Sequence, residues 1–337
     1  MKYFENIDLR ILIIFLSIFI LSFFIKTISK YLNLYDNPNS KRKLHQKPIS
    51  TINGLLILLT LNIYFLLDIF LFNEFYFQIN IIFLLLINIF YFIGYIDDIK
   101  NLSPIKKSII IFTILLILIP LDQNLILNSL IFENLTNKEI YLNQASVFIT
   151  VFFIYIFYNF LNFIDGLNGV AISVAIFFIS ILGLNRGVFL NLEILIILSL
   201  LYCLALNIKN ISFLGNAGVA VLGIFISILY VFEYNLNKTL LSDEIFLIFF
   251  IPGMDMTRLV ISRIKSGKSI SDGDLNHLHH YLLNITNKKY VFLIYILMTV
   301  IPFLMTKIIN NNLIIIILSF IIYTFTIILL KRFPKKT

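Results

Sequence analysis

The sequence predicts an all-α membrane protein, a polytopic bundle of about eleven transmembrane helices, and three observations support this fold class. Hydrophobic residues make up 60% of the 337 positions and charged residues only 13%, whereas soluble domains carry about 25% charged residues. The mean hydropathy is +0.97. The apolar residues form separate runs of about 20, the length that an α-helix needs to cross about 30 Å of hydrocarbon. A water-soluble domain is therefore excluded.

Eleven apolar runs follow one another along the chain, separated by short polar segments. They cover residues 9–29, 52–72, 78–96, 105–121, 145–164, 170–185, 192–208, 218–234, 244–262, 290–308 and 312–330. No internal repeat and no soluble segment interrupts this pattern, so residues 1–337 are predicted to form a single integral membrane domain. Lys26 and Lys30 follow the first run where a secretory signal would have small residues, so we expect a retained helix.

The basic residues predict how these helices cross the membrane. The net charge of +8 could suggest nucleic-acid binding, but the 26 Lys and Arg residues lie mainly in short loops between the apolar runs. This distribution is the one expected from the positive-inside rule. If the loop after the first run is cytoplasmic, 20 of these cations lie inside and 6 outside. We therefore expect the N-terminus outside and the C-terminus in the cytoplasm. The single cysteine, Cys203, excludes an intramolecular disulfide.

Five polar segments of unusual composition all fall on the predicted cytoplasmic side. They are residues 30–51, 97–107, 159–169, 209–218 and 263–289. The segments on the other side have the composition of plain connectors. Since loops carry chemistry when a rigid scaffold positions them, this one-sidedness predicts a site at the inner membrane interface.

Asp97 and Asp98 end the third run with two adjacent carboxylates. At a helix C-terminus both face mutual repulsion and the negative end of the helix dipole, so a cation is expected nearby. Magnesium suits this position because it takes carboxylate oxygens together with substrate phosphates. The alternative is a solvated helix end neutralised by Lys100, Lys106 and Lys107.

Asn159, Asn162 and Asp165 recur at three-residue spacing, which places them in a polar stripe along one face of an apolar helix. Polar groups at membrane depth usually face the bundle interior or a water-filled cavity. Gly166 and Gly169 then end the helix and allow a ligand to approach the backbone. The alternative is that the stripe holds neighbouring helices together by hydrogen bonds.

Histidines concentrate in the last long inner segment, where His277, His279 and His280 are three of the four in the chain. Histidine binds metal, donates to phosphate or transfers protons. Structural zinc is disfavoured because two of these histidines would need further ligands and the one cysteine lies in a membrane run.

Two weaker signals complete the set. Small residues around Asn216 open the eighth run, where N–H groups of a helix N-terminus could bind a phosphate, although a tight turn is the commoner explanation. A basic run in the first inner loop could fix the orientation of the protein in the membrane, bind anionic lipid or bind anionic substrates. This run contains Lys41, Arg42, Lys43, His45 and Lys47.

These segments, in this order and on one side, resemble the polyprenyl-phosphate N-acetylhexosamine-1-phosphate transferases of glycosyltransferase family 4. The matching motifs are Arg-Lys-x-His at 42–45, Gly-Tyr-Ile-Asp-Asp at 94–98 with Leu-Ser-Pro at 102–104, Asn-x-x-Asn-x-x-Asp-Gly at 159–166 and His-Leu-His-His at 277–280. The last motif, with Asp255 before it, is similar to the branch that uses simple UDP-sugars in O-antigen, common-antigen or teichoic-acid linkage synthesis. The resemblance covers nearly the whole chain.

The resemblance implies an activity and a set of site residues. The activity is transfer of N-acetylhexosamine 1-phosphate from a UDP-sugar to undecaprenyl or another polyprenyl phosphate at the cytoplasmic face of a bacterial inner membrane, with release of UMP and with magnesium, or manganese, as cofactor. The catalytic residues implied are Asp97, Asp98, Asp165, His277, His279 and His280. The substrate-binding residues implied are Lys41, Arg42, Lys43, His45, Lys47, Asn159, Asn162 and Asn168. The metal ligands implied are Asn216, Asp98 and Asp165.

Four departures from the family pattern bear on activity. The family usually has Asp where this chain has Asn216, and that Asp is regarded as a direct magnesium ligand. An amide oxygen still coordinates but carries no charge, so the resemblance leaves metal binding open. Asn168 replaces a common Asp, Asn53-Gly54 replaces a usual glycine pair, and Leu275 takes a position often held by Arg.

Two alternatives to an active transferase stay open. An inactive homologue that binds polyprenyl phosphate or scaffolds a partner would explain Asn216. A secondary transporter would place ionisable residues near the bilayer midplane in two related halves, which the sequence does not show. The sequence does not determine the sugar, the downstream polymer or the oligomeric state, for which a homodimer is one option.

Overall fold

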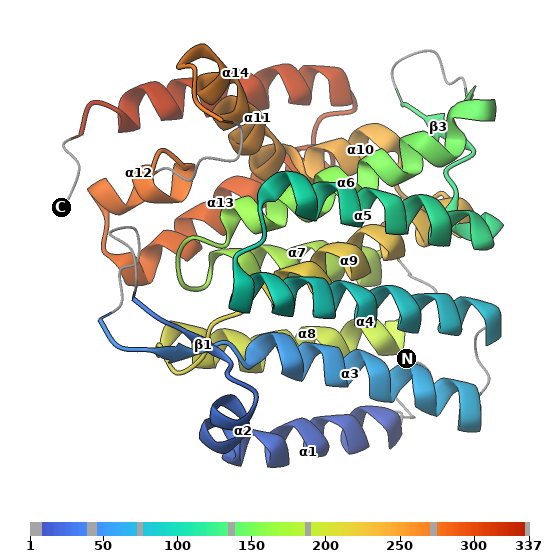
Figure 1. Cartoon of the computed structure of the whole chain (residues 1–337). Helices are drawn as coiled ribbons and strands as arrows, with labels where there is room; N and C mark the ends of the chain where they lie inside the picture. The colour runs from blue at the N-terminus through green and yellow to red at the C-terminus, as the bar shows by residue number, and fades with distance from the viewer. Residues whose placement is uncertain are drawn as a thin grey trace.

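The computed structural model describes residues 9–38, 46–72, 77–133, 139–185, 190–269 and 275–333. Within these ranges the chain forms fourteen α-helices, most of which run along a common direction in one bundle (Figure 1). The helices are α1 (Leu9–Phe23), α2 (Ile25–Tyr31), α3 (Asn53–Leu67), α4 (Phe77–Lys100), α5 (Pro104–Leu118), α6 (Ser146–Ile164), α7 (Val170–Leu184), α8 (Leu190–Ile208), α9 (Gly215–Asn237), α10 (Ser242–Ile248), α11 (Phe250–Lys265), α12 (Leu278–Ile285), α13 (Lys288–Met305) and α14 (Asn312–Leu330). Shorter turns are the π-helix η2 (Asp68–Phe72) and the 3-10 helices η3 (Ile119–Leu121), η4 (Gln123–Leu125) and η5 (Asn143–Ala145).

Each predicted apolar run coincides with one helix or with a bent pair of helices. In the described chain, eight helices are long and apolar enough to cross a membrane, and ten spans result if each bent pair counts as one. The bent pairs are α1–α2, with 73° between the helices, and α10–α11, with 70°. The remaining run corresponds to α7, which has only 15 residues. The polytopic helical bundle is thus confirmed, while eleven crossings and their orientation stay predictions.

The two ends of the bundle carry different parts of the chain. In Figure 1, α1 begins toward the right-hand end and α14 ends at the left-hand end, as an odd number of crossings requires. At the left-hand end α4, α6 and α8 finish and α3, α5 and α9 begin. The polar segments that follow or precede these helices therefore gather at one end, in agreement with the one-sidedness of the sequence.

Two small antiparallel sheets lie outside the helices. β1 (Tyr35–Asp36) pairs with β2 (Ile49–Ser50) in the first inner loop. β3 (Ser129–Ile131) pairs with β4 (Glu139–Tyr141) between α5 and α6, where the composition predicted a plain connector. The backbone N–H of Ile131 donates to the Tyr234 hydroxyl at 2.8 Å, so this hairpin is tied to the far end of α9.

Helix α9 forms the centre of the bundle, with almost every residue from Ala217 to Tyr234 buried, and it packs on α3, α4, α6 and α7. Small residues allow this close packing, as is usual between membrane helices. A Cβ built on Gly94 of α4 would lie 2.5 Å from the Ala217 Cα, and one on Gly54 of α3 would lie 2.6 Å from the Gly218 nitrogen. The end of α4 and the starts of α3 and α9 are thereby brought together.

The contacts of Asn53 explain why this residue stands where the family usually has the first glycine of a pair. It is fully buried at the start of α3, and its side-chain amide donates to the carbonyl oxygens of Cys203 at 3.1 Å and Ser212 at 3.3 Å. Asn53 therefore joins α3 to the end of α8 and the loop that leads into α9, a role that a glycine could not fill.

We expect Gly94→Ala to destabilise the protein, because the added methyl group would collide with the backbone of α9 and push the two helices apart. Overpacking of this kind costs about 1–3 kcal/mol. The buried thiol of Cys203, the one cysteine in the sequence, reports unfolding when a maleimide dye is present during heating. Gly253→Ala in α11 is the matched control, since no atom lies within 4 Å of its added Cβ. Equal unfolding midpoints for the two variants would contradict the need for close packing at Gly94.

Candidate active site

A cavity of about 780 Å³ lies between the end of α4, the start of α5, the end of α6, the start of α9 and the loop before α12. Four of the five polar segments singled out in the sequence contribute to its walls. Its polar and charged lining residues are Asp97, Lys107, Ser108, Tyr155, Tyr158, Asn159, Asn162, Asp165, Asn216, Arg263, Ser269, His277, His279 and His280. The fold thus brings together most of the residues predicted from the sequence.

Asp97 is buried in the last turn of α4, and both of its carboxylate oxygens accept hydrogen bonds. Oδ1 accepts from the Leu102 N–H at 2.8 Å, and Oδ2 accepts from Lys107 Nζ at 2.8 Å. The Lys107 ammonium also lies 5.4 Å from the centre of the Tyr158 ring. This ion pair braces the turn between α4 and α5, so a lysine neutralises the first of the two adjacent carboxylates.

Asp98 faces a different element, the N-terminus of α9. Its Oδ1 accepts from the Asn216 N–H at 2.9 Å and its Oδ2 from the Ala217 N–H at 3.2 Å. Gly215 precedes them with φ of +70°, and a Cβ there would come within 3.0 Å of Asp98 Oδ2. The N–H groups of Asn216 and Ala217, which the sequence suggested for a phosphate, are therefore bonded to Asp98.

Asp165 directly follows α6 and differs from both carboxylates of α4. Among the described residues its carboxylate has no hydrogen-bond or ion-pair partner, although it lines the cavity. Desolvation, together with the nearby negative charges of Asp98 and Asp36, raises the pKa of Asp165 to about 7. A carboxylate that lies near other acids and has no ion-pair partner is a strong candidate for contact with a metal or a cationic group.

The asparagines of the predicted stripe separate into two groups. Asn159 and Asn162 line the cavity, and Asn159 also donates to the Tyr155 carbonyl oxygen at 2.7 Å. Asn168 does not line it. Its amide donates to the Asn207 carbonyl oxygen at 2.6 Å and to the Asn210 side chain at 2.9 Å, which joins the α6–α7 turn to the end of α8.

The three clustered histidines lie in contact with one another at the start of α12. The rings of His277 and His279 are stacked with centroids 5.1 Å apart, and those of His279 and His280 are 4.5 Å apart. His279 is fully buried, and burial lowers the pKa of its imidazole well below the ordinary value, with the charges of its two histidine neighbours acting in the same direction. It packs against the turn after α6, where a Cβ on Gly166 would lie 2.3 Å from Nε2. His279 is therefore neutral and fixes the turn that carries Asp165.

Sequence reasoning missed Arg263 as a site residue. It lies near the end of α11, is only 4% exposed, lines the cavity and has its guanidinium 5.1 Å from the centre of the Phe163 ring. The sequence did offer a signal, because Arg263 is a permanently charged residue directly after the apolar run 244–262. A charge buried at such a place is costly and usually functional. From the sequence alone, Arg263 was assigned only to the cytoplasmic cations that indicate the orientation in the membrane.

The basic run contributes little to the described cavity. Lys41, Arg42, Lys43 and His45 lie outside the described residues, and Lys47 is exposed and does not line the cavity. Leu275, at a position often held by Arg in the family, does line it.

The donor set of the cavity suits a hard cation. Asp165 and Asn216 line the cavity. Asp98, which is bonded to the Asn216 N–H, lies close enough to Asp165 for its charge to raise the pKa of that carboxyl. In the described part of the chain no three His, Cys, Asp or Glu side chains are arranged as a ready metal site. Magnesium does not need one, because it binds through one or two carboxylates, substrate phosphates and water.

These features define a class: a polytopic helical membrane protein whose bundle holds a cavity lined by carboxylates, amides, cations and histidines. Residues 80–233 match the model of the family described as Glycosyl transferase family 4, a range that includes both carboxylates of α4, Asp165 and Asn216. This match and two curated relatives support the resemblance that the motifs predicted.

Two curated relatives support this assignment. The chain is 32% identical over 142 residues to a protein of Bacillus subtilis (strain 168) named "Probable undecaprenyl-phosphate N-acetylglucosaminyl 1-phosphate transferase", and this match spans 40% of each chain. It is 25% identical over 290 residues to the undecaprenyl-phosphate alpha-N-acetylglucosaminyl 1-phosphate transferase of Escherichia coli O157:H7, which covers 82% of this chain and 76% of the relative.

We expect Asp165→Asn to stabilise the protein in the absence of substrate and divalent cations, and to do so most at high pH. The pKa of about 7 in the folded state lies above the ordinary value of about 3.9, so the folded protein retains a proton that the unfolded chain loses. Stability therefore falls as pH rises from about 4 to about 7, and asparagine avoids this loss.

The measurement is size-exclusion chromatography of heated, detergent-solubilised protein. The melting difference between Asp165→Asn and wild type should be larger at about pH 8 than at about pH 5. Asp122→Asn, which removes the same charge beyond the far end of α5, should show no such trend. A difference at Asp165 that is independent of pH would contradict the raised pKa.

Proposed function

We propose that the protein transfers an N-acetylhexosamine 1-phosphate from a UDP-sugar to undecaprenyl phosphate, or another polyprenyl phosphate, at the cytoplasmic membrane face. UMP is released, and the product starts a lipid-linked cell-envelope glycan. The observation that most supports this proposal is the cavity in which carboxylates, amides, cations and histidines from separate segments converge. The names of the two relatives support the lipid acceptor and the sugar phosphate.

The cavity suits phosphoryl transfer because its charges are divided between two groups of elements. An oxygen of the lipid phosphate attacks the sugar-linked phosphorus, and the bond to the UMP oxygen breaks. Catalysis of such a step is mostly positioning and neutralisation of charge. Arg263 supplies positive charge, and His277 and His280 supply donors to phosphate oxygens. Lys107 is held at the cavity by its ion pair with Asp97. His279, which is neutral and buried, holds the turn at Asp165.

Magnesium, or manganese, is the proposed cofactor, and Asp98, Asp165 and Asn216 would hold it together with substrate phosphates. When bound, it would neutralise charge on the diphosphate of the UDP-sugar. Its positive charge would also offset the repulsion from Asp98, which adds to desolvation in raising the pKa of Asp165. Asp98 keeps a lone pair for a metal, because a carboxylate has about four acceptor positions. Three are used by the N–H groups of Asn216 and Ala217 and by the Asn216 side chain.

The cytoplasmic orientation of the site is part of the proposal. It is supported by the 20 to 6 division of the cations and by the gathering of the polar segments at one end of the bundle (Figure 1). That same gathering disfavours a secondary transporter, whose ionisable residues would lie near the midplane. An inactive, lipid-binding homologue is the second candidate, and the uncharged Asn216 is the observation that favours it.

Turnover of a radiolabelled UDP-N-acetylhexosamine with polyprenyl phosphate tests the proposed activity. Wild-type protein should release UMP, and Asp165→Asn should lower turnover by at least about 100-fold, the scale of losing a main electrostatic contributor. Asp122→Asn, at the far end of the bundle, should keep wild-type turnover. Near-normal turnover in Asp165→Asn would contradict the role of this residue, and absence of UMP release by the wild type would favour the inactive homologue.

Asn216→Asp should lower the magnesium concentration needed for half-maximal turnover. Mg²⁺ prefers anionic oxygen ligands and gives up water reluctantly, so a neutral amide in place of a carboxylate weakens the site. The measurement is a magnesium titration of both forms at fixed substrate concentrations. An unchanged or raised half-saturation would show that Asn216 is not a deficient ligand.

A further inference from the structure

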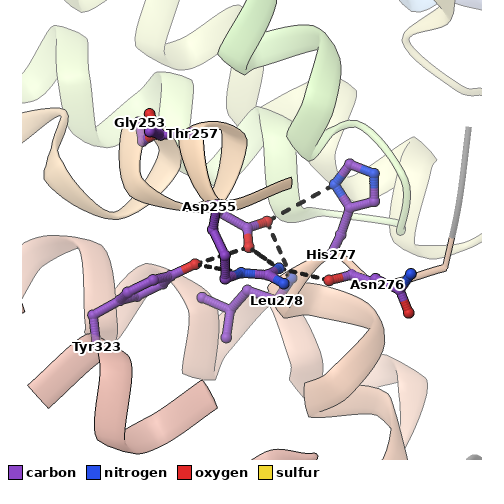
Figure 2. Close-up of polar contacts among 8 residues, drawn as sticks. Gly253, Asp255, Thr257, Asn276, His277, Leu278 and Tyr323 are labelled. Carbon is purple, nitrogen blue, oxygen red and sulfur yellow. Dashed lines mark hydrogen bonds and ion pairs between the residues drawn. The ribbon is translucent and has the colours of Figure 1, made fainter. Parts of the chain in front are cut away.

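Asp255 of α11 lies at the centre of a buried network that no step of the proposed reaction uses. It is 1% exposed. Its Oδ1 accepts from Arg258 Nη2 at 2.6 Å, one turn further along α11, and from the Tyr323 hydroxyl of α14 at 3.0 Å (Figure 2). Arg258 Nε also donates to the Tyr323 hydroxyl at 3.0 Å. Two helices thus hold one carboxylate in a fixed place.

This carboxylate holds the chain on both sides of His277. Both Asp255 oxygens accept from the Leu278 N–H, at 3.1 and 3.2 Å, which caps the start of α12 from another helix. Arg258 Nη2 donates to the Asn276 carbonyl oxygen at 2.6 Å. The backbone of His277 between them is extended, with φ −66° and ψ 153°. Figure 2 shows the Asp255 carboxylate directed at this short segment.

The imidazole of His277 is fixed as well. Its Nδ1 lies 3.8 Å from Asp255 Oδ2. The centre of its ring lies 5.6 Å from the centre of the Phe163 ring, and the ring stacks on His279. His277 also lines the cavity, so its ring lies between the Asp255 carboxylate and the cavity. A carboxylate within ion-pair distance favours a ring orientation that keeps Nδ1 towards it.

Stability alone is a weak explanation for the network. Buried ion pairs add little net stability, because the loss of hydration offsets most of their attraction. Within the described residues, the hydrogen bonds from Asp255 and Arg258 to other segments end on Tyr323 or on residues 276–278. The Arg258 guanidinium also lies 5.6 Å from the centre of the Tyr281 ring in α12. The network therefore acts on the short segment that carries His277 into the cavity.

We propose that Asp255 is a positioning residue for the transfer reaction, which holds His277 against the cavity through the Leu278 N–H and the Nδ1 edge of the ring. The inference rests on the proposed function. Displacement of a catalytic group by about 1 Å costs about 100-fold in rate, so loss of this support lowers the catalytic constant more than it raises KM for the UDP-sugar.

The test is a double-mutant cycle between Asp255→Asn and His277→Ala. Asp255→Asn keeps an oxygen acceptor for Leu278 but removes the charge that orders Arg258 and faces His277. It should lower kcat at least about tenfold, and it should have little further effect in the His277→Ala background. Equal losses in both backgrounds, or a loss that simply follows a lower melting temperature, would overturn the proposal.

Tyrosine variants provide a matched pair in case Asp255→Asn fails to fold. Tyr323→Phe removes one hydrogen bond to Asp255 and should lower kcat severalfold. Tyr295→Phe removes a buried hydroxyl that has no hydrogen-bond partner in the described structure, and it should keep wild-type kcat. Equal kcat values for the two variants would count against the proposal.

A chemical readout separates this proposal from the proposed activity. Diethyl pyrocarbonate modification of His277, measured by mass spectrometry relative to His280, should rise in Asp255→Asn because the ring is no longer held. If wild-type protein shows no turnover but His277 modification rises, the transfer activity fails while the positioning of His277 stands. If wild-type protein turns over substrate and Asp255→Asn changes neither kcat nor modification, the positioning proposal fails alone.

Discussion

The junction between the Asp98 carboxylate and the first N–H groups of α9 is the constraint on which the site depends. A helix N-terminus leaves N–H groups unbonded, and the interior of a membrane bundle offers little water to satisfy them. Asp98 supplies both acceptors from the end of α4. Gly94 lets the two backbones touch one turn earlier, so α4 and α9 meet at a fixed distance and direction. The cavity forms where these two helices and α6 end or begin at one level.

That geometry also arranges the charges of the cavity. Asp98 at the end of α4 lies close to Asp165 at the end of α6, and these two carboxylates form an acidic wall. Asp165 lines the cavity, as do Lys107 of α5 and Arg263 of α11. Asp97 belongs to the acidic sequence motif but is neutralised by Lys107, so the two adjacent carboxylates do different work. Asp97 braces the turn between α4 and α5, whereas Asp98 caps α9 and lies close to Asp165. Anionic substrates and a hard cation fit such a division because each finds opposite charge without a large rearrangement.

The sequence predicted the helices well because hydrocarbon thickness and helix rise fix the length of an apolar run. It also predicted that the polar segments lie together, since successive crossings return every second loop to the same side. It did not predict the roles of Asn168 and Arg263. The contacts of Asn168 are with residues about forty positions away, and the position of Arg263 depends on the 70° bend between α10 and α11. Residue spacing within one helix contains no information on either. The β3–β4 hairpin was missed because strands of three residues are too short to show alternation.

The acidic wall of Asp98 and Asp165 also explains why a neutral side chain stands at Asn216. Asn216 begins α9 directly beside Asp98, and the pKa of Asp165 is already raised by desolvation and by the charges of Asp98 and Asp36. A third carboxylate here would add repulsion whenever no cation is bound, at the helix end on which the packing of α9 depends. A neutral amide relieves that repulsion and keeps an oxygen for coordination, but it gives up part of the attraction for the cation. In the proposed metal site, Asn216 would thus shift the balance between the stability of the empty site and its affinity for the cation.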